Sequence, residues 1–286
     1  MKTNRNFNSL IAIATILVLF TTACSKSNSS APKPATPSVT GVQLTANATF
    51  GNILTDNTGR SLYFFADDAA GTSTCIGGCA VTWPVFYQAN PTIGTGLSAS
   101  DFSKITRTDG TMQTTYKGWP VYYYTGDSKA GDVKGDAFVN LWFVGKADYS
   151  VMVSDAQLVG ADGLNYNDQG LPGTVQSMYI TNPSGQTLYL FTKDTHDTNN
   201  FTASNFSNNS AWPIDTLSAV GSIPSILDKT QFSIITVYGK TQLVYKGHPM
   251  YYFGKDDSMR GSTKGVSYPT PDAAIWKVQN NNTPVL

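Results

Sequence analysis

Two closely spaced cysteines are the residues whose chemistry is easiest to define. Cys75 and Cys79 are separated by Ile-Gly-Gly, and the third cysteine, Cys24, lies far upstream. In an oxidising compartment two neighbouring cysteines usually form a disulfide, and the small loop that it closes predicts a stabilisation near or below ~2 kcal/mol. A redox-active pair and a metal site are the alternatives, although a zinc site needs four ligands.

A repeated aspartate is the second group that could carry chemistry. The pattern G-x-x-x-Y-x-[FY]-x-x-D occurs four times, and we call residues 59–68, 118–127, 185–194 and 247–256 copies 1 to 4. Its residues are Gly59, Tyr63, Phe65 and Asp68; Gly118, Tyr122, Tyr124 and Asp127; Gly185, Tyr189, Phe191 and Asp194; and Gly247, Tyr251, Phe253 and Asp256. Loop carboxylates can bind Ca²⁺ or serve as the acid and base of a glycosidase. Because the aspartate recurs in every copy, we expect instead a structural role, in which it accepts backbone N–H groups just past a strand.

Three further carboxylates lie near this pattern and could join a cation site. They are Asp67, Asp197 and Asp257. The only histidines are His196 and His248, and His248 with Met250 could bind a soft metal such as copper. Met250 occupies an apolar position of the pattern, which favours packing instead. The sequence therefore assigns no metal and no cofactor.

The many aromatic side chains could form a stacking surface for a sugar, but alternation places most of those in the pattern inside the fold. Trp119 and Tyr123 lie off the shared face and are the better candidates for exposure. The sequence contains no G-x-S-x-G, no H-E-x-x-H and no phosphate-binding glycine loop. An enzymatic activity is therefore less favoured than binding.

The repeated pattern predicts the second strand of a hairpin. Its glycine follows a turn such as Asp56-Asn57-Thr58 and stands where a positive φ is needed. In the following strand Tyr63 and Phe65 share one face, whereas Leu62 and Phe64 share the other, so both faces are apolar and should be covered. All nineteen acidic residues are aspartate, which prefers turns over helices, and the sequence therefore predicts an all-β fold.

A longer repeat divides the chain into two similar halves. Gln113, Tyr116, Gly118 and Pro120 recur as Gln242, Tyr245, Gly247 and Pro249, and a tryptophan follows each copy, at Trp83, Trp142, Trp212 and Trp276. This pattern indicates a tandem duplication of a sandwich-like or barrel-like β-rich unit, with short helices at residues 98–105 and 224–230. A small four-bladed propeller is the alternative.

The N-terminus carries the features of a bacterial lipoprotein signal. Lys2 and Arg5 precede the apolar run 10–20, and Thr21-Thr22-Ala23-Cys24 resembles a lipobox, so we expect Cys24 to be lipidated. The sequence predicts a signal peptide at 1–23, a flexible tether at 24–41, β-rich domains at 42–158 and 173–280 with a linker at 159–172, and a tail at 281–286. The chain has 19 basic and 19 acidic residues, and this balance argues against a nucleic-acid partner.

Two segments resemble a known bacterial family. Cys75-Ile-Gly-Gly-Cys79-Ala-Val-Thr-Trp83-Pro84 and residues 106–120 resemble predicted lipoproteins with a conserved Yx(FWY)xxD motif, also described as a secreted repeat of unknown function. The resemblance implies an extracytoplasmic lipoprotein with a repeated β-rich domain, but no activity. The second half departs from this pattern, because Ser204 and Asn208 replace the two cysteines.

We therefore expect a lipid-anchored protein that binds or scaffolds at the cell envelope, with the outer membrane as the favoured destination. Its partner would be an envelope protein or a glycan. The alternatives are a redox or copper-like metal-handling protein that uses Cys75 and Cys79, and a carbohydrate-binding or carbohydrate-active protein.

Overall fold

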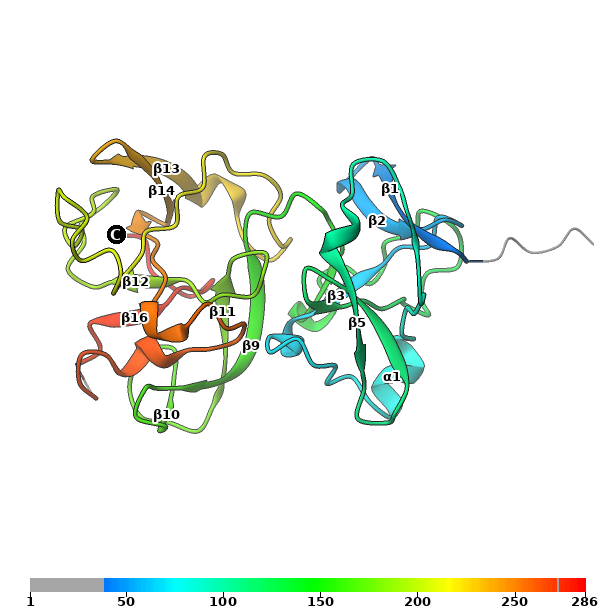
Figure 1. Cartoon of the computed structure of the whole chain (residues 1–286), viewed down its shortest axis with the longest axis horizontal. Coiled ribbons are helices and arrows are strands. Elements are labelled where there is room, and N and C mark those ends of the chain that lie inside the picture. Colours follow the sequence, from blue (N-terminus) through cyan, green and yellow to red (C-terminus); the bar gives the residue numbers. More distant parts are fainter. Residues whose placement is uncertain (1–38, 272) are drawn as a thin grey trace, which may run out of the picture. The chain divides into compact units, whose positions relative to one another are not determined.

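The computed structural model of the chain describes residues 39–271 and 273–286 (Figure 1). The predicted signal peptide, Cys24 and most of the predicted tether lie outside the described residues. No helix in the described part of the chain has the length and apolar content that a membrane crossing requires.

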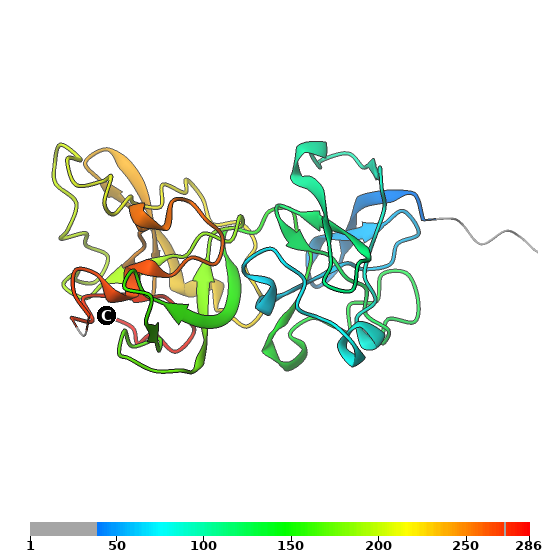
Figure 2. The same ribbon diagram turned by 60° about the horizontal axis from the view of Figure 1, so that its bottom comes forward.

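The fold is mostly β, as predicted, and its strands are short. The strands up to residue 144 are β1 (Gly41–Asn47), β2 (Gly51–Asp56), β3 (Tyr63–Phe65), β4 (Thr92–Ile93), β5 (Phe102–Thr106), β6 (Met112–Tyr116), β7 (Trp119–Pro120) and β8 (Trp142–Val144). Those that follow are β9 (Met152–Val159), β10 (Asn165–Tyr166), β11 (Gln176–Thr181), β12 (Tyr189–Phe191), β13 (Phe232–Val237), β14 (Lys240–Tyr245), β15 (His248–Pro249) and β16 (Trp276–Val278). Long irregular segments connect them (Figure 2).

The strands form small sheets of two or three strands. Their orders are β2-β1-β4, β3-β8, β5-β6-β7, β10-β9-β11, β12-β16 and β13-β14-β15. All pairs are antiparallel except β1 with β4. Within the described residues there is no closed barrel, and no sheet has the four strands of a propeller blade.

The sheets of the two halves correspond to one another. We call copies 1 and 2 with their strands β1 to β8 the first half, and copies 3 and 4 with β9 to β16 the second half. Three groups of paired strands recur in the same order and direction. They are β1-β2 with β9-β11, β3-β8 with β12-β16, and β5-β6-β7 with β13-β14-β15. The tandem duplication read from the motifs is therefore present in the strand pairing.

The pairing of β9 departs from the predicted division. β9 covers the end of the predicted first domain and the first residue of the predicted linker, and its residues 152–157 pair with β11, from Met152 opposite Thr181 to Gln157 opposite Gln176 (Figure 1). The second half thus begins before the expected linker 159–172, which instead contains β10 and connects two paired strands. Sequence alternation does not reveal the strand with which a segment pairs.

The repeated pattern forms the predicted hairpins. Leu62 donates its backbone N–H to Leu54, and all four motif glycines have φ between +80° and +87°. Tyr63 and Phe65 pack in one core cluster while Leu62 and Phe64 pack in another, so the strand is covered on both faces as expected.

The predicted helices are largely absent from the places where we expected them. The described residues contain one short α-helix, α1 (Gly78–Thr82), and 3-10 turns η1 (Ala66–Asp68), η2 (Ala99–Asp101), η3 (Phe138–Asn140), η4 (Lys229–Gln231), η5 (Gly254–Asp256) and η6 (Lys264–Ser267). The segment 98–105 continues from η2 into β5, because its apolar residues pair with β6, and the Ser98 side chain makes no capping bond. Helical propensity is a weak signal that a paired strand overrides.

The motif tryptophans meet in pairs, one pair in each half. Trp83 stacks on Trp142 with ring centroids 3.7 Å apart, and Trp212 stacks on Trp276 at 3.5 Å. The second aromatic residue of each copy extends the stack from the tryptophan of the other copy. These outer contacts are Phe65 on Trp142 (4.2 Å), Tyr124 on Trp83 (4.3 Å), Phe191 on Trp276 (4.6 Å) and Phe253 on Trp212 (4.4 Å). Each half is therefore built around a four-ring stack to which both of its copies contribute.

Candidate functional site

The motif tyrosines and aspartates contact each other across the two copies of each half. Tyr63 and Tyr122 exchange both backbone hydrogen bonds, and so do Tyr189 and Tyr251. Each tyrosine hydroxyl then donates to the aspartate of the opposite copy. The pairs are Tyr63 with Asp127 (2.7 Å), Tyr122 with Asp68 (2.6 Å), Tyr189 with Asp256 (2.7 Å) and Tyr251 with Asp194 (2.7 Å). The repeat unit of the fold is thus a pair of copies that complete one another.

The second oxygen of each aspartate holds the loop that follows its own strand. It accepts a backbone N–H from a residue six to eight positions downstream. The donors are Thr74 to Asp68 (2.7 Å), Lys134 to Asp127 (2.9 Å), Asn200 to Asp194 (2.7 Å) and Lys264 to Asp256 (2.9 Å). The sequence predicts backbone acceptance in a short Asx-turn, whereas these bonds close longer loops, and the spacing does not predict the tyrosine bond.

Burial controls the electrostatics of these carboxyls. Asp68 is 0% exposed, and burial raises its pKa to about 6 despite bonds from Tyr122 and Thr74 that favour the charged form. Burial also raises the pKa of Asp194 and Asp256 to about 6 and that of Asp127 above its usual value. Burial next to Asp68 likewise raises the pKa of Tyr122 well above its usual range, so its hydroxyl stays protonated and donates.

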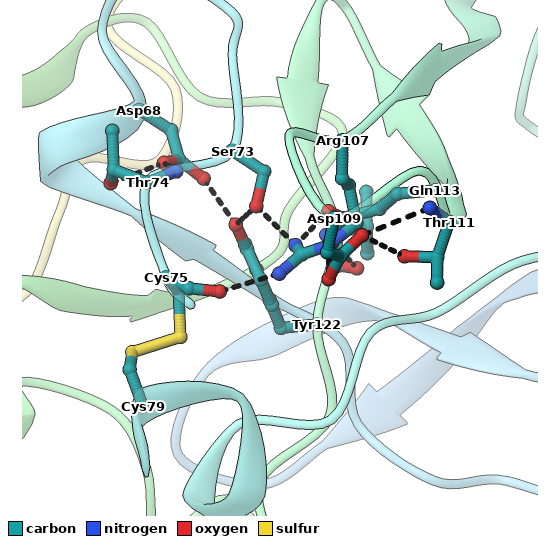
Figure 3. A network of polar contacts seen from close by, with 11 residues as sticks. Asp68, Ser73, Thr74, Cys75, Cys79, Arg107, Asp109, Thr111, Gln113 and Tyr122 are labelled. Atoms are coloured by element: carbon teal, nitrogen blue, oxygen red, sulfur yellow. Dashed lines mark hydrogen bonds and ion pairs between the residues drawn. A yellow bond between two sulfur atoms is a disulfide. The ribbon is translucent and has the colours of Figure 1, made fainter. Parts of the chain in front are cut away.

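A buried arginine extends this network in the first half only. Arg107, just after β5, donates from Nη1 to the Gln113 side chain (2.7 Å) and to Ser73, and from Nη2 to the Cys75 carbonyl (2.6 Å) (Figure 3). Ser73 also contacts the Tyr122 hydroxyl at 2.6 Å. The guanidinium thereby links β6 and the Tyr122–Asp68 pair to the segment that carries Cys75.

The cysteines form the disulfide that their spacing predicts. Cys75 is buried and Cys79 is half-buried in α1, so the bond ties the incoming segment to the start of this helix (Figure 3). Trp83, the residue that caps the other end of α1, donates its backbone N–H to Cys79 and belongs to the aromatic stack. Arg107, the disulfide and Trp83 therefore hold one surface segment at three successive points.

The second half satisfies the same positions differently. Gln242, the counterpart of Gln113, accepts from the Asn199 amide at 2.7 Å where the first half uses Arg107. Asn208 stands in place of Cys79 and bonds the Phe201 carbonyl and the Ala203 N–H. Side-chain amides replace both the charge and the disulfide there. Thr236 precedes Gln242 by the same number of residues as Arg107 precedes Gln113. This replacement of arginine by threonine in the second half is the sequence signal that points to Arg107.

The structure corrects the two aromatic residues that we expected on the surface. Trp119 is 1% exposed and its indole donates to the Pro183 carbonyl at 3.0 Å. Tyr123 is 8% exposed, bonds Asp56 at 2.9 Å and lies under the Arg60 guanidinium. Both are packing residues, because the face opposite the motif tyrosines is covered as well.

The residues considered for metal binding do not come together. His196 is exposed beside Asp197, whereas His248 is buried and contacts the Pro284 carbonyl at 2.9 Å. Met250 is fully buried in the core, as its apolar position predicts. Asp67 is half-buried and Asp257 pairs with Lys264 on the surface. In the part of the chain that the structure describes, no three His, Cys, Asp or Glu residues form a group that could hold a metal ion.

Apolar side chains are exposed on the two segments that meet at Trp83. Val81 on α1 is 73% exposed, and Ile76 in the disulfide loop is 53% exposed. On the other segment Phe138 packs its ring 5.7 Å from Trp83 yet remains 40% exposed, and its neighbour Val139 is 63% exposed. We call Ile76, Val81, Phe138 and Val139 the apolar rim.

The backbone of the rim is strained at Val139. This residue has φ 47° and ψ 24°, a left-handed conformation that is rare for a β-branched side chain and costs about 1–3 kcal/mol. Ala137 and Asn140 also have positive φ, and hydrogen bonds from Ala137 to Trp142 and from Asn140 to Ala137 hold the turn. Strain of this kind persists where the surrounding structure fixes it, and it commonly marks functional segments.

Comparison with known proteins finds one family that matches the first half. Residues 44–87 and 103–146 each match one family, described as a secreted repeat of unknown function, and the matched stretches contain copies 1 and 2. The family resemblance read from the motifs is therefore confirmed. No curated protein and no solved structure matches the chain.

Removing one motif hydroxyl tests the exchange. We expect Tyr122→Phe and Tyr251→Phe each to lower the free energy of unfolding by about 1–3 kcal/mol, because a buried carboxylate oxygen loses its donor. Urea unfolding followed by tryptophan fluorescence measures this change. Tyr238→Phe is the control, since Tyr238 is exposed; equal stability of all three variants would contradict the role of the hydroxyls.

The raised carboxyl pKa values predict how stability depends on pH. Asp68, Asp194 and Asp256 keep their protons up to about pH 6 when folded, but release them near the ordinary value of 3.8 when unfolded. The folded state binds more protons between these values, so the free energy of unfolding should fall by at least ~1 kcal/mol from pH 5 to pH 7.5.

Measuring the free energy of unfolding of Asp68→Asn over the same pH range tests whether the motif aspartates cause this dependence. The variant should be less stable than the natural chain at pH 7.5, because the natural carboxylate accepts from both Thr74 and Tyr122 and the amide cannot, and its stability should change less with pH. Asp228→Asn, at an exposed carboxyl whose pKa is below the usual value, should leave the pH profile unchanged. Stability that rises from pH 5 to 7.5 would refute the prediction.

Proposed function

We propose that this chain, a member of the secreted-repeat family, is a lipid-anchored binding protein of the bacterial cell envelope that contacts another envelope protein through its apolar rim. The observation that carries the proposal is the difference between the halves at this position. Asn205 and Ser210 stand where the first half exposes Ile76 and Val81, although the underlying aromatic stack is the same in both halves.

The polar residues of the motif support binding rather than catalysis. The carboxylates of all four copies use both oxygens in internal hydrogen bonds, and three of the four are at least nine-tenths buried. A substrate could reach the three buried carboxylates only by breaking the paired copies. The groups that remain free to act on another molecule are those of the surface.

The rim suits a protein partner better than a glycan. Its four side chains are apolar, whereas sugars are recognised by hydrogen-bonding groups arranged around an exposed aromatic face. The disulfide and Arg107 hold one rim segment in place, and the backbone bonds of residues 137–142 hold the other. A rigid apolar surface loses little conformational entropy on binding, which favours affinity.

Crosslinking in intact cells tests the rim. A photo-crosslinking residue at position 81 or 138 should capture one defined envelope protein, and the double variant Val81→Ser, Phe138→Ser should reduce capture from a third rim position, 139, at least tenfold. Tyr238→Ser is the matched control in the second half, because Tyr238 is also exposed and apolar. Capture that persists in the double variant, or that is equal from position 238, would refute the proposal.

Membrane attachment requires a separate experiment. We expect a Cys24→Ser variant to lose labelling by a palmitate analogue and to move from the membrane fraction to the soluble extracytoplasmic fraction, because the lipid supplies the membrane affinity. Cys75→Ser with Cys79→Ser is the control and should stay with the membrane. Retention of Cys24→Ser in the membrane would show that another segment anchors the chain.

A further inference from the structure

A cavity of about 180 Å³ opens to the surface of the second half beside β15 and β16. Leu190, His248 and Val278 line it from the strands, and Thr283 and Pro284 line it from the C-terminal segment. The segment 281–286 is held against the fold, because the Lys246 ammonium donates to the carbonyls of Asn281 and Thr283. The cavity is smaller than the ~300 Å³ lower end of pockets for drug-sized molecules, so it fits a small ligand.

The matching position of the first half is almost filled. There, Phe64, Trp119 and Lys146 surround a space of about 10 Å³. The duplicated strands place Leu190, His248 and Asn280 at the positions of these three residues. Each second-half side chain is smaller than its first-half counterpart. The open volume is therefore a local difference between two otherwise corresponding sites.

The exchange of tryptophan for histidine keeps a hydrogen bond while it frees space. Trp119 donates from Nε1 to the Pro183 carbonyl, and His248 contacts the Pro284 carbonyl through Nε2 at 2.9 Å. A carbonyl only accepts, so Nε2 of His248 carries the proton. Burial lowers the pKa of His248, which favours the neutral ring. The ring thus adds no charge to the cavity at neutral pH.

Two opposite charges line the cavity without pairing to each other. The Asp168 carboxylate accepts from the Asn280 amide at 2.9 Å, and the Lys277 ammonium donates to the Gln169 side chain at 3.4 Å. Among the ion pairs of the described residues, none joins Asp168 to Lys277. Leu190 and Pro284 supply the apolar part of the wall.

We infer that this cavity binds a small zwitterion of the α-amino acid class. Its ammonium group would face Asp168, its carboxylate would face Lys277, and a short apolar side chain would lie against Leu190 and Pro284. One molecule with both charges satisfies two groups that do not satisfy each other. A sugar fits less well, since no Phe, Tyr or Trp lines the cavity for stacking. The inference does not depend on the apolar rim.

Calorimetric titration of the full chain in detergent with L-valine tests the inference. We expect saturable binding with a dissociation constant below ~1 mM. Isovalerate lacks the ammonium group and isobutylammonium lacks the carboxylate, so each should bind at least tenfold more weakly than L-valine. Equal binding of either half-molecule, or absence of saturable L-valine binding, would overturn the inference.

Three substitutions locate the binding. Asp168→Asn and Lys277→Gln should each weaken L-valine binding at least tenfold, and His248→Trp should abolish it by restoring the first-half residue. Lys104→Gln is the control, because Lys104 is a charged residue that lines an open surface pocket of the first half. Thermal unfolding shows whether each variant is folded. L-valine binding that is unchanged in folded Asp168→Asn and Lys277→Gln variants would place the ligand elsewhere and refute the site.

Discussion

The exchange of tyrosine hydroxyls and aspartate carboxylates between two copies is the interaction on which each half depends. A single copy leaves one oxygen of its aspartate without a donor and its tyrosine hydroxyl without an acceptor, which is costly away from water. Pairing two copies supplies both at 2.6–2.7 Å and joins their strands through the two tyrosine backbones. The tryptophans stack in the same arrangement. One copy therefore has no reason to be stable alone, and the functional unit of this fold is the pair.

Both halves share the tyrosine–aspartate exchange and the tryptophan stack, which together we call the frame. The halves can therefore differ at positions that the frame does not use. The first half adds Arg107 and the disulfide and fills the position of Trp119, whereas the second half uses Asn199 and Asn208 and opens a cavity beside His248. The buried guanidinium is tolerated because it donates to Ser73, Gln113 and the Cys75 carbonyl and pairs with the Asp109 carboxylate at 3.4 Å. The halves thus share their stabilising interactions but expose different surfaces.

The sequence predicts the interactions that are local and repeated. Spacing within one copy reveals the hairpin, the positive φ of the glycine and the two apolar faces, and the five-residue cysteine segment reveals the disulfide. It does not reveal the partner of Tyr122, because Asp68 lies 54 residues away and either aspartate of the half would fit the pattern. The pairing of β9 with β11, the burial of Trp119 and Tyr123, and the contacts of Arg107 were missed for the same reason. Each depends on which distant segment lies opposite.

Comparing the halves of a duplicated chain separates residues of the frame from residues of function. A side chain that recurs in all four copies and makes the same bond in each, as Asp68, Asp127, Asp194 and Asp256 do, is explained by the frame. A side chain present in one half and replaced in the other, such as Val81 by Ser210 or Trp119 by His248, is not required by the frame. The residue at such a position is instead set by the molecule that the surface or the cavity contacts. The rim of the first half and the cavity of the second half are therefore two places where this frame can carry separate binding roles.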